Sequence, residues 1–184
     1  MSYDFYLAVP REGEDADEMM ERICAPSPEA SPDTKADARR RELAEALVMS
    51  SPKLELFLPD PEEYAKQMSV SLDEAKRQCN NVELNVPEDD PSGIQIEIYE
   101  DGAMVTIPYW HDERASEFMQ EVWGYLQVIE RNTEYKTYDP QLDRWLDLSS
   151  DIEEVTSRYR NVVQKAQAQF ANQAQPKKPW WKFW

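Results

Sequence analysis

IQIEIYEDGAMVTIP, residues 94–108, alternates apolar and polar side chains on both sides of an Asp-Gly pair. A period of two buries one face of a strand and leaves the other in water. Asp101-Gly102 favours a hairpin turn, in which we expect Gly102 to adopt the positive φ that glycine tolerates. The segment upstream, from Val82 to Val86, alternates in the same way. Three antiparallel strands are therefore the centre of the predicted fold.

Helices and further strands surround this hairpin. Apolar side chains at helical spacing predict three main helices, at residues 35–50, 112–131 and 150–173. Three short helices are also expected, at 15–23, 61–68 and 71–80. Outside the hairpin, the expected strands lie at 3–9, 133–138 and 144–148, with an edge strand or extended segment at 52–59.

This order of elements predicts an α+β fold with an antiparallel or mixed sheet and helices mainly on one face. We expect residues 1–150 to form a single domain that contains a flexible acidic, proline-rich loop at about 11–34. Residues 151–175 predict a long C-terminal helix, and residues 176–184 form a short tail rich in lysine and tryptophan.

The composition limits the classes of partner. The formal net charge is −17, with 37 Asp and Glu against 20 Lys and Arg. Binding to a phosphate backbone requires clustered cations, so nucleic acid is not an expected partner. The charge fits either a protein partner with a basic surface or a simple need for solubility. Hydrophobic residues make up 41% of the chain, which is enough to form a core.

The cysteines and the N-terminus favour a cytoplasmic protein. Cys24 and Cys79 are the only cysteines, and they form no C-x-x-C motif for zinc or redox chemistry. The first residues lack the basic and apolar regions of a signal peptide. There is no run of about 18 apolar residues that could span a bilayer.

The C-terminal tail, PKKPWWKFW, carries three lysines, four aromatic residues and no acid. Trp side chains favour sites that are partly apolar and partly wet, so the tail should dock on a surface. Three interpretations remain open. The tail could bind in a groove of a partner protein, anchor weakly to an anionic membrane at the inner face, or fold back onto its own acidic body.

Three motifs together resemble a family of small acidic bacterial proteins of uncharacterised activity. They are SYDFYL at residues 2–7, IPYWH at 107–111 and YDPQ at 138–141, the last followed by Leu142 and by RWLD at 144–147. The resemblance covers most of residues 2–148 and leaves out the last helix and the tail. It implies bacterial origin and a shared fold, and it supplies no catalytic residue.

The same motifs contain the candidate partner-binding residues. Aromatic and arginine side chains are the usual energetic centres of interfaces. We expect a shallow groove formed by Tyr109, Trp110, His111, Tyr138, Gln141, Arg144 and Trp145. Four further aromatic anchors belong to the tail: Trp180, Trp181, Phe183 and Trp184.

No catalytic, metal or cofactor site is predicted. His111, the only histidine, could act as a general base or ligand, but no nucleophile or second ligand is tied to it by a motif. Asp139 begins a segment that superficially resembles a calcium loop, but Arg144 occupies the position that requires glycine.

These patterns favour a non-enzymatic bacterial protein-binding module, of which an immunity or adaptor protein is the most concrete form. It would use its acidic surface and its aromatic C-terminal peptide. One alternative is a peripheral membrane protein held weakly by the tail. A second alternative is an enzyme of unknown type centred on His111.

Overall fold

The computed structural model describes residues 2–24, 34–57, 60–79, 81–109 and 113–173. Over these residues the chain forms seven strands and six helices, which confirms the predicted α+β class. The strands are β1 (Ser2–Ala8), β2 (Glu55–Phe57), β3 (Val82–Asn85), β4 (Gln95–Ile98), β5 (Gly102–Pro108), β6 (Lys136–Asp139) and β7 (Arg144–Trp145). The helices are α1 (Ala16–Cys24), α2 (Thr34–Ser50), α3 (Pro61–Met68), α4 (Leu72–Gln78), α5 (Ala115–Asn132) and α6 (Ile152–Gln173).

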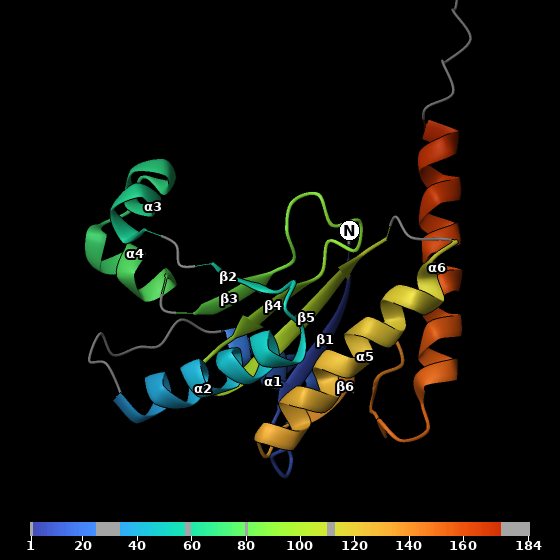
Figure 1. Ribbon diagram of the computed structural model, residues 1–184, viewed down its shortest axis with the longest axis horizontal. Coiled ribbons are helices and arrows are strands. Elements are labelled where there is room, and N and C mark those ends of the chain that lie inside the picture. The colour runs from blue at the N-terminus through green and yellow to red at the C-terminus, as the bar shows by residue number, and fades with distance from the viewer. Residues whose placement is uncertain (1, 25–33, 58–59, 80, 110–112, 174–184) are drawn as a thin grey trace, which may run out of the picture.

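All seven described strands form one antiparallel sheet in the order β2-β3-β4-β5-β1-β6-β7 (Figure 1). The predicted hairpin is its centre, because β4 and β5 pair through Ile98 and Ala103 across the Asp-Gly turn. β1 completes the middle of the sheet, with Phe5 opposite Val105 of β5 and Tyr6 opposite Tyr138 of β6. β2 and β7 are the two edges.

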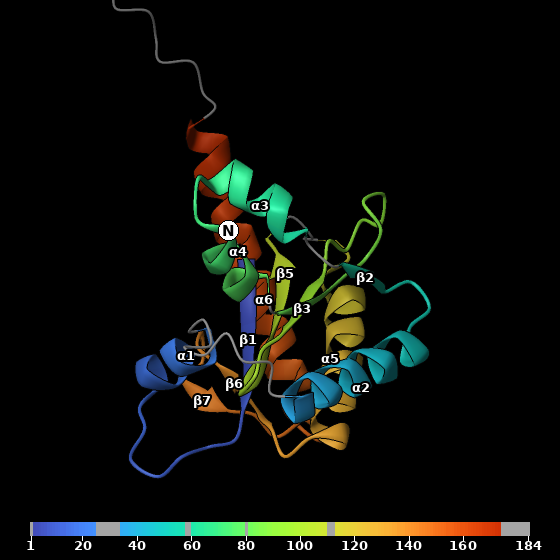
Figure 2. The same cartoon turned by 90° about the vertical axis from the view of Figure 1, so that its left-hand side faces the viewer.

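Successive side chains of β1 point to opposite faces of the sheet and so contribute to two separate hydrophobic clusters. Tyr3, Phe5 and Leu7 are fully buried in the main core, to which α2, α5 and α6 contribute apolar side chains. Ala8, with Tyr6 beside it, packs in a second cluster against Met19 and Ile23 of α1. Figure 2 shows α1 and α5 on opposite sides of the sheet. The sheet is therefore covered on both faces, most heavily by the three larger helices.

A buried tyrosine of the C-terminal helix contacts the sheet directly. The hydroxyl of Tyr159 donates to the carbonyl of Pro108 at 2.6 Å, and its ring meets the ring of Tyr3 edge-on at 5.6 Å. Tyr159 is fully buried, so both contacts lie in the main core. They attach α6 beside the ends of β5 and β1.

Gly102 serves a different purpose from the one expected. The described glycines with positive φ are Gly13 and Gly93, so the positive φ predicted for Gly102 is wrong. Instead, a Cβ built on Gly102 would lie 2.6 Å from the carbonyl oxygen of Leu7 and 2.9 Å from Cγ1 of Ile23. Glycine is required here because β1 and α1 approach the backbone too closely for a side chain.

Helices α3 and α4 form an arm, residues 60–79, at the β2 edge of the sheet (Figure 1). Asp60 caps α3 by accepting from the backbone of Glu62 at 2.8 Å, and Ser71 accepts from the backbone of Glu74 at 3.1 Å. Aspartate and serine side chains are common caps at the starts of helices. Ala75 of α4 is buried, whereas Met68 at the end of α3 is 58% exposed.

Candidate functional site

The residues of the predicted groove are divided between the two faces of the sheet. Tyr138 belongs to the second core cluster, on the α1 face. Tyr109, which follows β5, packs instead against the main core. The structure thus places these two rings against different clusters, although β5 and β6 flank the same strand. Trp110, His111 and the tail aromatics lie outside the described residues.

Tyr138 and Trp145 do come together. They are partners across β6 and β7, and their rings meet edge-on at 5.4 Å. Trp145 is 37% exposed and Tyr138 only 5%, so the indole is the accessible part of the pair. Such a pair offers one anchor for a partner at the β7 edge of the sheet.

Arg144 and Gln141 form hydrogen bonds that stabilise the turn between β6 and β7 and its contact with α6. Arg144 donates to Asp151 at 2.6 Å and to Glu154 at 2.7 Å, which fixes β7 to the start of α6. The backbone N–H of Gln141 donates to the Asp139 carboxylate at 2.8 Å, and its carbonyl accepts from Arg158 at 3.1 Å. The side-chain oxygen of Gln141 is buried and has no hydrogen-bond partner among the described residues.

Most of the exposed apolar side chains lie elsewhere in the described chain, and sequence patterns did not reveal them. Eight large apolar side chains are exposed in the described residues, and six of them lie between residues 49 and 72. These six are Met49, Leu56, Phe57, Met68, Val70 and Leu72. This segment is therefore richer in exposed apolar side chains than the rest of the described chain.

Two of these residues, Met49 and Leu56, line a cavity of about 840 Å³ between α2 and the β2–β3 edge, which we term the apolar cleft. Its apolar lining consists of Ala44, Val48, Met49, Leu56, Val82 and Leu84. Met49 is 86% exposed and Leu56 is 51% exposed, so two lining side chains remain open to solvent. The rest of the lining consists of Arg40, Arg41, Glu45, Cys79 and Asn81.

Among the described strands, the one beside the apolar cleft is an edge of the sheet. β2 pairs with β3 alone, and all three of its residues are exposed. Edge strands present unpaired N–H and C=O groups that can accept another strand. Two residues of this edge strand, Leu56 and Phe57, have apolar side chains that are each about half exposed. The cleft therefore combines an apolar pocket with backbone groups available for pairing.

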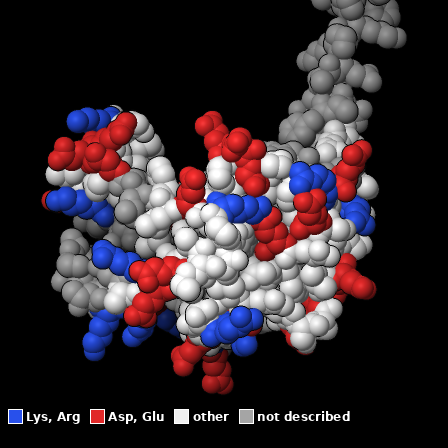
Figure 3. All heavy atoms as spheres, in the orientation of Figure 1, with Lys and Arg blue, Asp and Glu red and all other residues white. Residues whose placement is uncertain are grey.

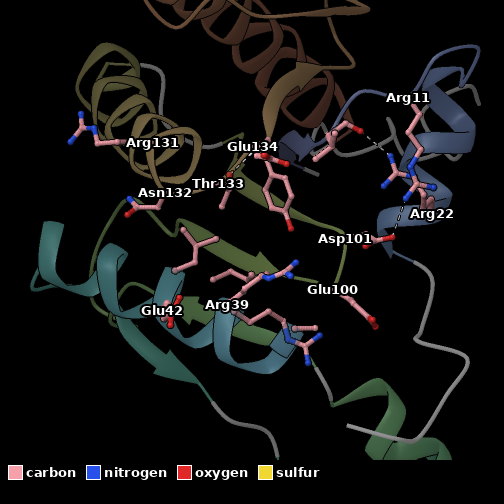
Figure 4. Close-up of a pocket in the computed structure, with 16 residues that line it drawn as sticks. Arg11, Arg22, Arg39, Glu42, Glu100, Asp101, Arg131, Asn132, Thr133 and Glu134 are labelled. Carbon is pink, nitrogen blue, oxygen red and sulfur yellow. Dashed lines mark hydrogen bonds and ion pairs between the residues drawn. The ribbon is translucent and has the colours of Figure 1, made fainter. Parts of the chain in front are cut away.

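A second cavity, of about 690 Å³, lies on α2 toward its N-terminal end and is lined by five arginines: Arg11, Arg22, Arg39, Arg40 and Arg131. We term it the arginine hollow. Figure 4 shows Arg11, Arg22 and Asp101 gathered at one end and Arg131 and Asn132 at the other. Its lining shares only Arg40 with that of the apolar cleft.

Two of these arginines form ion pairs with acidic side chains. Arg22 forms a bidentate pair with Glu14, at 2.6 and 2.8 Å, and both side chains are mostly buried. The hydrogen bonds lower the pKa of Glu14 and raise that of Arg22. Arg11 contacts Asp101 at 3.4 Å, with both side chains 54% exposed. These pairs connect α1 and the β4–β5 turn to the loop that follows β1.

No family model, curated protein or solved structure matches the chain. The candidate site is therefore defined by its own geometry, that of the apolar cleft and the arginine hollow.

The described residues contain neither an activated thiol nor a group of metal-binding side chains. Burial raises the pKa of both Cys24 and Cys79, so their thiols stay protonated and weakly nucleophilic. Within the described ranges, no three His, Cys, Asp or Glu side chains gather closely enough to hold a metal ion. None of the described helices has the length and apolarity needed to cross a bilayer.

Proposed function

We propose that this protein is a non-enzymatic binding module that holds an apolar segment of a partner protein in the apolar cleft. The observation that carries the proposal is a cavity of about 840 Å³ that is lined by two exposed large apolar side chains, Met49 and Leu56, and lies beside the edge strand β2. Leaving such a patch in water is unfavourable, and patches of this kind commonly mark protein–protein contacts.

The edge strand gives the partner segment a defined conformation. An extended peptide that pairs with β2 would continue the sheet and gain backbone hydrogen bonds. Its alternate side chains could then reach Leu56 and the interior of the cleft. An immunity or adaptor role would use this surface to cover or connect another protein within a bacterial cell.

Charge contributes mainly to the rate of encounter and to the choice of partner. The chain is strongly acidic overall, yet the face in Figure 3 carries Lys and Arg interspersed among Asp and Glu. A basic partner would be attracted at long range by the net charge of −17. Apolar contacts in the cleft would then supply the specific affinity.

Photo-crosslinking tests the proposal directly. A photoreactive amino acid would replace Met49 in the cleft or, as the control, Val9, which is 41% exposed and outside it. In an extract of the native host, we expect one protein to crosslink at position 49 and not at position 9. The Leu56→Asp substitution should abolish that crosslink, because a charge would be buried in the complex. A crosslink that is equal at both positions, or unaffected by Leu56→Asp, would contradict the proposal.

The tail remains a second proposed binding element. Removing residues 176–184 should weaken the position-49 crosslink if the tail contributes to the same partner. If the tail instead attaches the protein to membranes, its removal should leave the crosslink unchanged and abolish co-sedimentation with anionic vesicles at low salt. The two assays therefore separate the protein-binding and membrane interpretations of PKKPWWKFW.

A further inference from the structure

The end of the arm exposes apolar side chains to solvent. We define the arm tip as residues 66–74, which contain the end of α3, the turn and the start of α4. All residues from 66 to 73 are exposed. Three of them are large and apolar, namely Met68, Val70 and Leu72, at 58%, 38% and 41% exposure. Apolar side chains gathered in one surface turn point to a contact that the single chain does not make.

The rest of the arm buries little apolar surface. In its described part, α3 contributes no buried side chain and α4 contributes Ala75. A surface helix normally buries one apolar face against its own domain. The arm instead holds its tip away from the core, at the β2 edge of the sheet (Figure 1).

The arm tip does not fill the apolar cleft of its own molecule. Cys79 and Asn81, which follow α4, line the cleft, so the base of the arm belongs to its wall. The seven residues of α4 separate this base from the tip by about 10 Å along the helix axis. No residue of the tip lines the cleft, and the apolar side chains of the tip stay exposed. Within the described residues, each surface is thus open to a second molecule.

The charges of the two surfaces are complementary. The charged residues of the cleft lining are Arg40, Arg41 and Glu45, and those of the arm tip are Lys66, Asp73 and Glu74. Arg40 and Glu74, which have opposite signs, already interact within their own chain. The side chains of the other four form no ion pair or hydrogen bond with another described residue. Each surface therefore offers one free charge of each sign: Asp73 matches Arg41, and Lys66 matches Glu45.

This local balance matters because two copies of the chain repel each other. Each carries a formal net charge of −17. At about 0.15 M salt the Debye length is about 8 Å, so the charges closest to the contact dominate. The cleft and the arm tip can meet without bringing an excess of acids together.

We infer that the apolar cleft of one copy receives the arm tip of a second copy. Val70 and Leu72 of the tip pack against the apolar lining of the cleft, and Asp73 pairs with Arg41. The arm and β2 lie at the same end of the molecule (Figure 1), so a two-fold axis there lets each copy fill the cleft of the other. The consequence for regulation rests on the proposed function: while two copies are associated, their clefts are closed to the partner protein.

Analytical ultracentrifugation of the purified full-length protein tests the association. At about 0.15 M salt we expect a reversible monomer–dimer equilibrium with a Kd of about 1–100 μM, as for small interfaces. Leu72→Asp would place a charge in the contact and should weaken association about tenfold or more. Leu72 is the first residue of α4, where an acid is favourable, so this variant should fold.

Val9→Asp is the matched control. Val9 is also 41% exposed and lies outside both the cleft and the arm tip. The substitution adds the same charge and should change the Kd less than about twofold. A charge exchange tests the ion pair: Asp73→Arg should weaken association by about three- to fivefold, and adding Arg41→Asp should restore it.

Disulfide trapping tests the position of the tip. Two single-cysteine variants, Met49→Cys in the cleft and Val70→Cys at the tip, would be made with Cys24 and Cys79 replaced by serine. After the two proteins are mixed and oxidised, we expect a disulfide between one chain of each. Val9→Cys mixed with Val70→Cys is the control and should give a much lower yield.

Three results would overturn the inference: a wild-type protein that stays monomeric up to about 1 mM, equal weakening by Leu72→Asp and Val9→Asp, or equal disulfide yields from positions 49 and 9. The photo-crosslink at position 49, repeated in the Leu72→Asp protein, tests the proposed function separately. A host protein that crosslinks there while the wild type is monomeric would overturn the inference alone. A dimer that Leu72→Asp dissociates, without any host crosslink, would support self-association and contradict the proposed function.

Discussion

The hydroxyl of Tyr3, on the first strand, donates to the carboxylate of Asp139, at the end of β6, at a distance of 2.7 Å. Both residues are fully buried. The other carboxylate oxygen accepts from the backbone of Gln141 at 2.8 Å and of Leu142 at 3.3 Å. The bond thus joins two of the three sequence motifs, SYDFYL and YDPQ, in the main core. It explains a polar pair at the centre of an apolar cluster, because every buried oxygen of the carboxylate has a donor.

Removing the Tyr3 hydroxyl should therefore destabilise the protein. Tyr3→Phe keeps the ring and deletes one hydrogen bond to a charged group, which should lower the free energy of unfolding by about 1.5–3 kcal/mol. Urea unfolding followed by circular dichroism would measure the change. Tyr6→Phe is the control on the same strand, because its hydroxyl has no hydrogen bond to another described residue. It should change stability by less than about 0.5 kcal/mol, and an equal effect of both variants would contradict the assignment.

The titration of the Asp139 carboxyl should also appear in the pH dependence of the free energy of unfolding. Burial is the main cause that raises the pKa of its carboxyl above the ordinary value, against the opposing effect of its hydrogen bonds. The folded protein then holds a proton more readily than the unfolded chain, so this group stabilises less as pH rises through the window between the two pKa values. Asp139→Asn removes that titration. The stability of the variant relative to wild type should rise across this window above pH 3.8 and then stay level. A difference that falls with rising pH would contradict the argument.

Local patterns along the chain predicted the elements well. The alternation in residues 94–108 and the stripe in residues 112–131 identified β4, β5 and α5, because each pattern records one buried face. They could not predict which strands become neighbours. Tyr3 and Asp139 are 136 positions apart, and nothing in either motif specifies that β1 lies between β5 and β6. Pairing across the chain depends on the whole sheet.

The candidate site was harder to predict for a related reason. The apolar cleft depends on side chains that stay exposed, such as Met49 at the end of α2, whereas their spacing resembles that of buried ones. The arginine hollow unites Arg22, Arg39 and Arg131 only after folding. A run of three arginines at residues 39–41 was the one local sign of it. Arg144, which remains a predicted interface residue, connects β7 to α6 in the fold.

Two glycines give a matched pair of predictions. Gly102→Ala would force a Cβ to within 2.6 Å of the Leu7 carbonyl, so β1 or α1 must shift and stability should fall by about 1–3 kcal/mol. Gly124→Ala meets no atom within 4 Å on the exposed side of α5 and should raise stability by up to about 1 kcal/mol through helix propensity. Thermal unfolding of the two variants should shift the midpoint in opposite directions. A shift of the same sign in both would show that close approach does not explain Gly102.

The two arginine pairs beside the arginine hollow differ in burial and should differ in strength. Arg22 and Glu14 are 15% and 14% exposed and share two hydrogen bonds, so Arg22→Ala should cost about 1–2 kcal/mol. Arg11 and Asp101 are each 54% exposed and lie 3.4 Å apart, so this pair should contribute less than about 0.5 kcal/mol, and Arg11→Ala is the control.

The hydrogen bond from Arg22 lowers the pKa of Glu14. The stability that this bond contributes is therefore complete above the unfolded-state pKa of Glu14 and disappears as pH falls through the folded-state pKa. The penalty of Arg22→Ala in urea unfolding should therefore shrink as pH is lowered below 4.5. A penalty that is constant down to the folded-state pKa would show that Arg22 stabilises the protein through the packing of its stem alone.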